Sequence, residues 1–356
     1  MNLNIAVLPG DGIGPEIVDQ AKKVVLAVGE KFDHKITLKY GLVGAIAINK
    51  TGVPLPIETL ELCKSSDAVL FGAIGDPKYD NDPKAKVRPE QGLLAMRKEL
   101  GLYANVRPVT IIPSLADKSP LKKEIVNGVD LVMIRELTGG IYFGRPQGRS
   151  EDGKTAYDSC VYSRFEVERI VRLACEIAMK RSGRITVVDK ANVLATSRLW
   201  RETAMDISKE FHGLKMDFMF VDNAAMQLIQ NPGRFDVIVT ENMFGDILSD
   251  EASVITGSLG LLPSASVGLL TSVFEPIHGS YPQAAGKNIA NPLATILSAA
   301  MMFEMAFNLK GEGKAIRVAV EKSIEAGVMT EDLKKEKPSL TSKVGDFVSN
   351  YISHKK

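Results

Sequence analysis

The sequence predicts an α/β fold, and its length of 356 residues favours two domains over one. Short apolar runs alternate with amphipathic ones along the chain, a pattern typical of strands that alternate with helices. Several apolar runs end in charged or polar residues, and ligands bind beyond the carboxyl ends of strands in open α/β sheets. The 45% hydrophobic content is ordinary for a globular protein with a sizeable core.

The expected strands are short apolar runs. They cover residues 4–9, 67–74, 130–137, 184–190, 216–222 and 236–242. The expected helices are amphipathic and cover residues 15–32, 89–101, 164–182 and 197–211. Pro15 falls in the first turn of the first helix, where a proline is tolerated best. The polar segment 144–163 contains an Asp152-Gly153 turn signal and is expected to form a protruding hairpin.

Composition argues against several classes of protein. Lys and Arg total 44 and Asp and Glu total 43, a balance unlike that of a protein that binds nucleic acid or a membrane surface. The three cysteines are too widely spaced for a CxxC pair or a zinc set, and they suit a reducing compartment. The uncharged run 255–274 is about long enough to span a bilayer, but Pro263 and three glycines interrupt it. With no signal peptide before the first strand, we expect a cytoplasmic protein without a membrane span.

Two aspartates, Asp246 and Asp250, lie four residues apart in a segment that is expected to be helical. Side chains at this spacing are neighbours on one helix face, and like charges there are mildly destabilising. Either solvent weakens the repulsion or a positive group lies between the two carboxylates. With Asp222, at the end of a strand, they supply three hard oxygen ligands, a set that suits Mg²⁺ or Mn²⁺ better than zinc. The alternative for Asp246 is a favourable charge near a helix N-terminus.

The helix expected at 89–101 carries Glu90, Leu93, Leu94 and Arg97 along one stripe. The default interpretation is an ordinary amphipathic helix with its leucines in the core. The functional alternative is a small apolar pocket flanked by charge.

Charged and polar residues at the ends of strands form a second group of candidates. Four runs end in this way, at Arg135 with Glu136, at Lys190, at Asp222 with Asn223, and at Glu241 with Asn242. Residues of both signs after four strands favour a binding site over four independent loop starts. The arginine fork matches carboxylates, and the candidates for that task are Arg97, Arg107 and Arg135.

Two glycine-rich segments could hold phosphates. Residues 8–16 follow a strand and open a helix, but Pro15 occupies the last position of GxGxxG, so a Rossmann fingerprint is absent. Residues 275–292 form a long polar loop that opens a helix near Pro292. This loop is either a plain connection or a nucleotide loop at a helix N-terminus.

Together these segments resemble the β-decarboxylating dehydrogenases, which are metal- and NAD(P)-dependent enzymes acting on 2-hydroxyacids. The resemblance spans nearly the whole chain and rests on LPGDGIGPE, RELTGGIYFG, DKANVL, NMFGDILSDEAS and EPIHGS…AGKNIANP, which occur in the family's order. Within the family, residues 90–108 are similar to the members that act on 3-isopropylmalate in leucine biosynthesis. Isocitrate-specific members typically place a serine and an asparagine in this helix, whereas Leu93 and Leu94 suit an isopropyl group.

The resemblance implies an isocitrate/isopropylmalate dehydrogenase-type fold of two α/β domains without a Rossmann motif. The first domain would be discontinuous, with residues 1–102 plus 257–356, and would bind NAD. The central domain, residues 103–256, would carry the substrate and metal residues and the hairpin arm. Two subunits would pair through it as a homodimer, and Lys190 and Asp222 would reach into the partner subunit's site.

The resemblance also implies a role for each candidate. The arginines, with Glu90, Leu93 and Leu94, would bind the substrate, and Asp222 of the partner subunit would join Asp246 and Asp250 on Mg²⁺ or Mn²⁺. Lys190 would take the hydroxyl proton as hydride passes to NAD⁺, and Tyr142 would protonate the carbon left after decarboxylation. The reaction would convert (2R,3S)-3-isopropylmalate to 4-methyl-2-oxopentanoate.

The resemblance places the cofactor on the loop 275–292 and on the segment 75–90. The implied cofactor residues are Glu275, His278, Gly279, Ser280, Gln283, Gly286 and Asn291. Gln283 stands where NAD-using relatives usually carry an aspartate and NADP-using relatives a lysine followed by tyrosine. Because Gln283 is neutral and Ala284 follows it, the sequence favours NAD.

Other interpretations remain open from the residues alone. A Mg²⁺-dependent phosphohydrolase could use the same three aspartates, although it would have no need of nicotinamide. A non-catalytic nucleotide-binding protein would have no use for Lys190 and Tyr142 in one site. Within the family, the rivals are enzymes acting on homoisocitrate or tartrate.

Overall fold

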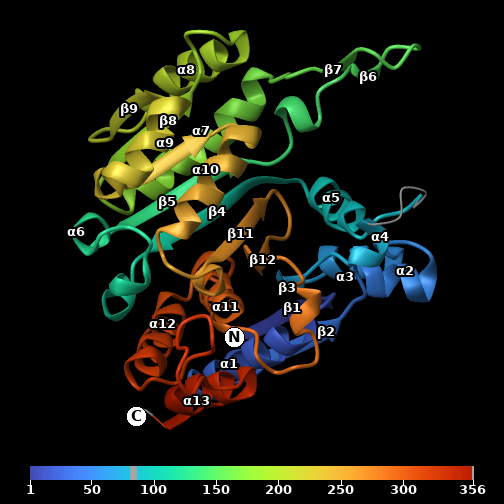
Figure 1. Ribbon diagram of the computed structural model, residues 1–356, viewed down its shortest axis with the longest axis vertical. Coiled ribbons are helices and arrows are strands. Elements are labelled where there is room, and N and C mark those ends of the chain that lie inside the picture. Colours follow the sequence, from blue (N-terminus) through green and yellow to red (C-terminus); the bar gives the residue numbers. More distant parts are fainter. Residues whose placement is uncertain (81–85, 355–356) are drawn as a thin grey trace. The chain divides into compact units, whose positions relative to one another are not determined.

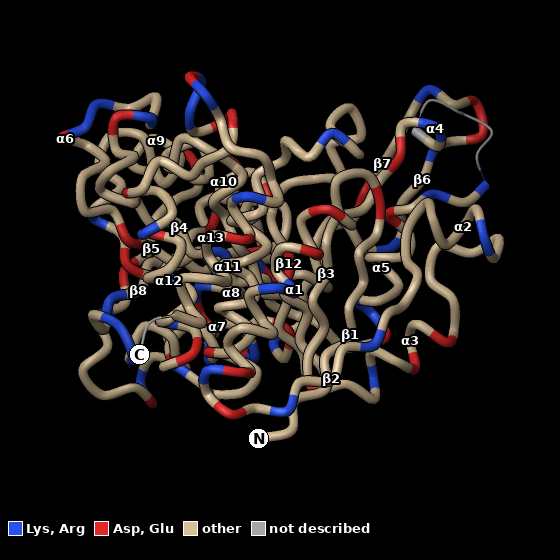
Figure 2. Tube along the Cα trace, turned by 90° about the horizontal axis from the view of Figure 1, so that it is seen from below, with Lys and Arg blue, Asp and Glu red and all other residues tan. Residues whose placement is uncertain are grey.

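The computed structural model describes residues 1–80 and 86–354, and Figure 1 shows its helices and strands. The chain forms two compact units, one of Met1–Leu102 with Ser258–Lys356 and one of Tyr103–Gly257. Both are α/β, so the predicted fold class is confirmed. Figure 2 shows basic and acidic residues interspersed along the chain. Residues 81–85 of the predicted cofactor-facing segment 75–90 lie outside the described residues.

The first unit is built on strands in the order β2-β1-β3-β12-β11. Strand β1 pairs in parallel with β2 and β3, β12 in parallel with β3, and β11 antiparallel to β12. The strands are β1 (Asn2–Gly10), β2 (Lys35–Tyr40), β3 (Ala68–Ala73), β11 (Pro263–Gly268) and β12 (Val273–Pro276). The helices are α1 (Gly14–Lys31), α2 (Ala45–Thr51), α3 (Ile57–Lys64), α4 (Pro77–Asp80), α5 (Glu90–Glu99), α11 (Leu293–Met305), α12 (Lys310–Glu325) and α13 (Thr341–His354), with short 3₁₀ turns η4 (Leu259–Leu261) and η5 (Pro282–Ala284).

The second unit has strands in the order β4-β5-β10-β8-β9. Strand β4 is antiparallel to β5, and the other neighbours are parallel. The strands are β4 (Leu102–Thr110), β5 (Asp130–Glu136), β8 (Arg184–Asp189), β9 (Lys215–Phe220) and β10 (Val237–Thr240). The helices are α6 (Lys123–Val126), α7 (Arg164–Met179), α8 (Ala195–Ser208), α9 (Val221–Gln230) and α10 (Asn242–Val254), with short 3₁₀ turns η1 (Pro113–Lys118), η2 (Gly140–Tyr142) and η3 (Pro232–Arg234).

The six strands and four helices expected from the sequence are present, with ends shifted by a few residues. Helix α7 begins where Ser163 and Glu166 form a reciprocal capping box, which satisfies backbone donors at its first turn. The run 255–274 follows the end of α10 and forms η4, β11 and β12 instead of one helix. Within residues 1–80 and 86–354, no helix is both long and apolar enough to cross a membrane.

An antiparallel ribbon forms within the segment predicted to be a hairpin. Strand β6 (Gln147–Arg149) pairs with β7 (Ala156–Asp158), with Gln147 opposite Asp158. Most of its residues are exposed, and Figure 1 shows it at the edge of the second unit. Its role as an arm that pairs subunits stays a prediction.

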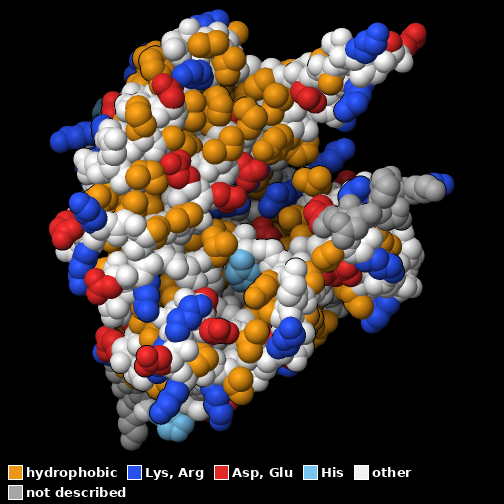
Figure 3. Space-filling model, in the orientation of Figure 1, with side chains coloured by type: hydrophobic (Ala, Val, Ile, Leu, Met, Phe, Trp, Pro, Cys, Tyr) orange, Lys and Arg blue, Asp and Glu red, His pale blue; other side chains and the backbone are white. Residues whose placement is uncertain are grey.

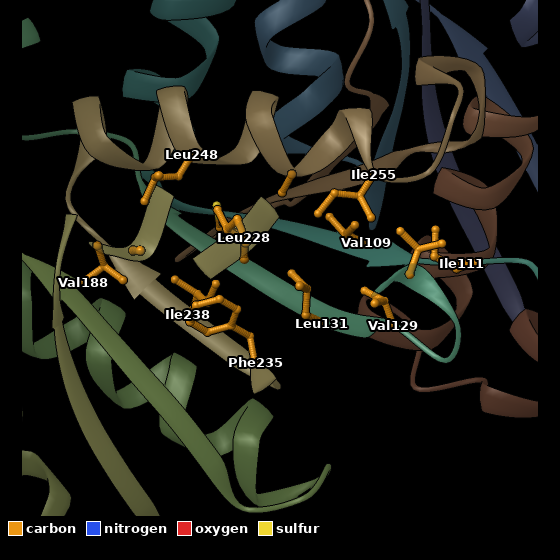
Figure 4. Close-up of a cluster of buried hydrophobic side chains, with 14 of the residues drawn as sticks. Val109, Ile111, Val129, Leu131, Val188, Leu228, Phe235, Ile238, Leu248 and Ile255 are labelled. Atoms are coloured by element: carbon orange, nitrogen blue, oxygen red, sulfur yellow. The ribbon is translucent and has the colours of Figure 1, made fainter. Parts of the chain in front are cut away.

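Helix α10 is fixed to its unit by one apolar face. Leu248 of α10 and Ile255, which directly follows this helix, pack in a buried cluster with Leu228 of α9 and Ile238 of β10, and Figure 4 shows these side chains pointing toward one another. Burying side chains of this size stabilises each by roughly 1.5–3 kcal/mol relative to exposure. Since Leu248 points inward, Asp250 on the same helix is left exposed.

Candidate active-site residues

The site in the second unit begins where two parallel strands end side by side. Thr240 of β10 pairs with Arg135 of β5, so the residues that follow both strands meet at one sheet edge. Arg135 is buried, and its Nε and Nη2 donate to Asn242 Oδ1 at 3.1 and 2.9 Å. Its Nη1 donates to Asp246 of α10. The first turns of α10 therefore hold the Arg135 guanidinium in one orientation.

A second arginine faces the next turn of the same helix. Arg107 Nε donates to Asn105 Oδ1 at 2.6 Å, and its Nη1 donates to Ser249 Oγ at 2.7 Å and to Asp250 Oδ1 at 2.9 Å. The repulsion between the two helical aspartates is thus offset within the chain, because each carboxylate has an arginine beside it. Both guanidinium groups are therefore held in fixed orientations beside the carboxylates of α10.

Tyr142 completes this cluster. It ends the turn η2, and its hydroxyl donates to Asp246 Oδ2 at 3.1 Å. The Arg135 guanidinium lies 5.9 Å from the centre of its ring. Burial and the neighbouring Asp246 carboxylate raise the pKa of the Tyr142 hydroxyl, so it stays protonated at neutral pH.

Lys190 and Asp222 form a separate pair. Lys190 Nζ lies 2.5 Å from Asp222 Oδ1, and this hydrogen bond lowers the pKa of the Asp222 carboxyl. Within the described part of the chain, neither residue has a hydrogen bond or ion pair to Asp246 or Asp250. Across residues 1–80 and 86–354, no three His, Cys, Asp or Glu side chains of the single chain are placed to hold a metal ion. The predicted metal triad, which takes Asp222 from the partner subunit, is not tested by a single chain.

In the first unit, the predicted pocket helix is α5. Its buried residues are Gly92 and Met96, whereas Leu93 is half-buried and the side chain of Leu94 is 46% exposed. The default interpretation, in which these leucines fill the core, is therefore wrong. Glu90 is also only half-buried, at the start of the same helix.

Arg97 lies near the end of α5 and is incompletely paired. Its Nη2 is 3.5 Å from Glu275 Oε1, a long ion pair, and its buried Nε has no hydrogen-bond partner. A buried polar atom without a partner carries a free-energy cost that a bound anion would remove.

The predicted cofactor loop is anchored to the start of α1. Ile13 N donates to the carbonyl oxygen of the buried Ser280 at 2.8 Å. His278 Nε2 is buried without a partner, and burial lowers the pKa of this imidazole, so it is neutral at pH 7. Space is open beside the α-carbons of Gly279 and Gly286.

Part of the same loop is already hydrogen-bonded inside the fold. Glu16 of α1 accepts hydrogen bonds from the backbone of Gly286 and, at 3.1 Å, of Asn288. Asn291 accepts from Leu293 N at 3.0 Å and donates to Asp332 at 2.9 Å. Gln283 is exposed. These hydrogen bonds hold the shape of the loop, while Gly279, Gln283 and Gly286 stay exposed on it.

Several residues that build these sites had no role assigned from the sequence. Glu136, Glu241 and Asn242 were candidates only as polar residues at strand ends, where β5 and β10 finish. Asp11 accepts from the backbone of Ala45, Ile46 and Gly75 and so ties three segments of the first unit together. Tyr162 carried no signal, because it lies between the hairpin and a helix.

The chain belongs to the isocitrate/isopropylmalate dehydrogenase family, whose model matches residues 4–348. The family resemblance seen in the sequence is thereby confirmed.

Individual proteins that are similar to this chain have names that agree with this family. A 3-isopropylmalate dehydrogenase of Bacteroides fragilis is 58% identical over 354 residues, covering 99% of both chains. One of Bacillus subtilis is 54% identical over 339 residues, covering 94% of this chain and 92% of its own. Among solved structures, an isocitrate dehydrogenase from Methylococcus capsulatus is similar with a TM-score of 0.87 and 35% identity, covering 99% of this chain and 100% of its own. A β-decarboxylating dehydrogenase from Thermococcus kodakarensis is similar with a TM-score of 0.83 and 36% identity, covering 98% of this chain and 96% of its own.

Proposed function

We propose that this chain oxidises and decarboxylates (2R,3S)-3-isopropylmalate to 4-methyl-2-oxopentanoate with NAD⁺ as the oxidant, a step of leucine biosynthesis. The choice of substrate rests on helix α5. This helix leaves Leu93 and Leu94 outside the core and also bears Arg97. An apolar branch would be bound by the leucines and a carboxylate by the arginine. The names of the relatives, two of them 3-isopropylmalate dehydrogenases, support the same substrate.

The substrate carboxylates are proposed to bind Arg97, Arg107 and Arg135. Arg97 has an unpaired buried Nε. Arg107 and Arg135 are held by Asn105 and Asn242, so their guanidinium forks are oriented before a ligand arrives. Orientation of this kind lowers the entropic cost of binding.

A divalent cation, Mg²⁺ or Mn²⁺, is proposed to bind Asp246 and Asp250 together with Asp222 of the partner subunit. The ligands fit such a hard cation, because all three are carboxylates, with Asp246 and Asp250 at adjacent turns of α10 and Asp222 on α9, and no His or Cys is among them. When bound, the cation would supply a Lewis acid at the substrate's 2-oxygen, and NAD⁺ would supply the hydride acceptor.

Lys190 and Tyr142 are proposed to move the protons. Lys190, a chemically competent base once neutral, would take the proton of the 2-hydroxyl directly or through water. Tyr142 would donate its hydroxyl proton to the carbon from which CO₂ has departed. Its raised pKa suits a group that must still carry its proton at neutral pH.

The nicotinamide cofactor is proposed to be NAD rather than NADP, on the loop that contains His278. A bound dinucleotide would give the buried Nε2 of His278 a hydrogen-bond partner and would occupy the open space beside Gly279 and Gly286. Gln283 is exposed and uncharged, and so offers no cation to a 2′-phosphate. Glu275, Ser280 and Asn291 would shape the loop.

A homodimer with shared sites is proposed from the surface of the second unit. Helices α9 and α10 contact each other and expose the apolar side chains of Met226, Ile247 and Val254. Figure 3 shows hydrophobic side chains gathered over the part of this unit where these helices lie. Exposed apolar patches of this kind mark association surfaces. Asp222 stands on α9 without a link to Asp246 of its own chain, as expected if it serves a second copy. We further propose a cytoplasmic location, where the three unpaired cysteines would stay reduced.

One assay tests the function. NADH absorbance is followed with 3-isopropylmalate, isocitrate, homoisocitrate, tartrate and malate in turn, with and without Mg²⁺. We expect metal-dependent NADH formation with 3-isopropylmalate far above the other acids. Faster turnover of any of the others, or phosphate release from phosphate esters in place of NADH formation, would contradict the proposal.

A further inference from the structure

Behind the Arg135 cluster lies a buried group of three side chains that the proposed reaction does not use. The Tyr162 hydroxyl is 3.2 Å from Glu241 Oε2 and 3.4 Å from Glu136 Oε2, and it accepts a hydrogen bond from Asn242 N at 3.0 Å. Glu136 is fully buried and the other two are nearly so. Burial raises the pKa of both carboxyls and of the Tyr162 hydroxyl. The hydroxyl therefore stays protonated and has one hydrogen to donate.

That hydrogen goes to Glu241. The Glu136 carboxylate already accepts from Thr138 N at 2.8 Å, from Thr138 Oγ1 at 2.6 Å and from Gly139 N at 2.7 Å, and it has an ion pair with Arg169 at 3.7 Å. The Glu241 side chain accepts from Phe244 N at 2.8 Å, which caps α10, through its other oxygen. The Tyr162 hydroxyl lies closer to the remaining oxygen of Glu241, at 3.2 Å, than to Glu136, at 3.4 Å, so it donates to Glu241.

The ring of Tyr162 shapes the turn that carries Tyr142. A β-carbon at Gly139 would lie 2.5 Å from Tyr162 Cε1, and one at Gly140 would lie 2.5 Å from its hydroxyl oxygen. Gly140 also has φ +76°, a conformation that favours glycine. The turn thus lies directly against Tyr162, and Asn242 Nδ2 ties it further by donating to Gly139 O at 3.2 Å.

We propose that Tyr162 is a positioning residue, whose ring and hydroxyl join the turn bearing Tyr142 to the first turn of α10 bearing Asp246. Its hydroxyl holds the backbone of Asn242 and the cap of α10, while its ring supports Gly139 and Gly140. Tyr162 thereby sets the 3.1 Å contact between Tyr142 and Asp246. This inference rests on the proposed function, in which Tyr142 is the proton donor and Asp246 is a metal ligand.

The test is Tyr162→Phe, which keeps the ring, including its edge contact with Trp200 at 5.5 Å, and removes only the hydroxyl. We expect turnover of 3-isopropylmalate to fall by about tenfold, since small displacements of reacting groups cost about that much or more. Combined with Tyr142→Phe, it should add less than about a twofold further loss, because residues that act through one another are not additive. A merely structural role would instead multiply the two losses.

Metal binding gives a readout that is independent of turnover. Mn²⁺ titration followed by electron paramagnetic resonance should show affinity weakened by about threefold or more in Tyr162→Phe. The control is Tyr103→Phe, a tyrosine of the same unit whose ring contacts the Arg169 guanidinium at 4.9 Å; its turnover and Mn²⁺ affinity should stay within about twofold of wild type. All proteins are compared below their melting temperatures.

The outcomes separate the two proposals. If wild type fails to turn over 3-isopropylmalate, the proposed function is wrong and the Mn²⁺ titration alone judges Tyr162. An unchanged Mn²⁺ curve, or fully multiplicative losses in the double variant, overturns the positioning role. If Tyr162→Phe does not fold, Glu241→Gln replaces it. Its amide oxygen keeps the cap of α10 through Phe244 N, and its amide nitrogen, which then faces Tyr162, cannot accept the hydrogen of the Tyr162 hydroxyl. The same losses are expected in the same direction.

Discussion

Replacing Asp250 by asparagine removes one negative charge from the proposed metal site and keeps the shape of the side chain. The amide oxygen can still accept from Arg107 Nη1, which lies 2.9 Å from Asp250 Oδ1. The side chain is 72% exposed, so the effective dielectric constant is close to that of water. Two unit charges about 4 Å apart then interact by about 1 kcal/mol, and a divalent cation by about twice that. Losing about 2 kcal/mol corresponds to roughly thirtyfold weaker binding, since 1.4 kcal/mol is about tenfold.

The assay is a titration of the purified protein with Mn²⁺, in which the signal of the free ion reports binding. A matched control is Asp117→Asn, because Asp117 is 74% exposed and pairs with Lys123 at 3.2 Å in the same unit. It loses the same charge from an equally exposed carboxylate away from α10. We expect the control to bind within about twofold of wild type. Neither change should alter stability by more than about 1 kcal/mol, as is usual for exposed pairs.

A binding curve for Asp250→Asn that superimposes on that of Asp117→Asn would refute the assignment of Asp250 as a metal ligand. A loss limited to about threefold would show that Asp250 acts only through the general field of the site. Both results would leave Asp250 as the ion-pair partner of Arg107.

Further predictions address the substrate pocket, the proton donor and the shared site. Leu94→Ala should weaken transition-state binding of 3-isopropylmalate by about 1–3 kcal/mol in kcat/KM, whereas malate, which lacks the isopropyl group, should be almost unaffected; equal losses for both acids would assign Leu94 to packing. Tyr142→Phe should lower kcat by roughly 10²-fold, and normal turnover with intact Mn²⁺ binding would exclude its role as proton donor. Lys190→Ala and Arg97→Ala should each give a nearly inactive homodimer, and reassembly of the two together should restore about a quarter of wild-type activity, because random pairing makes about half of the dimers hybrids with one intact site of two. Tagged hybrids that form but stay inactive would show that Lys190 does not serve the partner's site.

The strands and helices of this chain were largely predictable because their signals are local. Strand β3 is a continuous apolar run, and α1 combines Pro15 in its first turn with a regular apolar stripe. Strand β2, which was not among the expected strands, alternates polar residues with apolar ones, and none of its residues is fully buried. It is held by pairing with β1, from Lys35 opposite Asn2 onward, a long-range contact that composition does not reveal.

The pocket helix shows the limit of pattern alone. The stripe of Glu90, Leu93, Leu94 and Arg97 was equally compatible with a core face and with a binding face. Periodicity reports that side chains share a face, but the face that is buried depends on what packs against the helix. The structure buries Gly92 and Met96 instead and leaves Leu94 exposed, which argues against a core face, and the role of this stripe as a binding face stays a prediction.

The sequence by itself determined the inventory of chemical groups: carboxylates at helical spacing, arginines and a lysine after strands, and a glycine-rich loop. These depend on residue type and spacing along the chain, which a single sequence contains. Tertiary structure decided which groups meet. Arg135 reaches Asp246 because β5 and β10 run side by side in a register that places Arg135 next to Thr240. Tyr162, from the segment before α7, reaches Glu241 at the end of β10. These partners are 79 to 111 residues apart in the chain. Contacts over such separations depend on strand register and burial across the whole unit, and no local pattern encodes them.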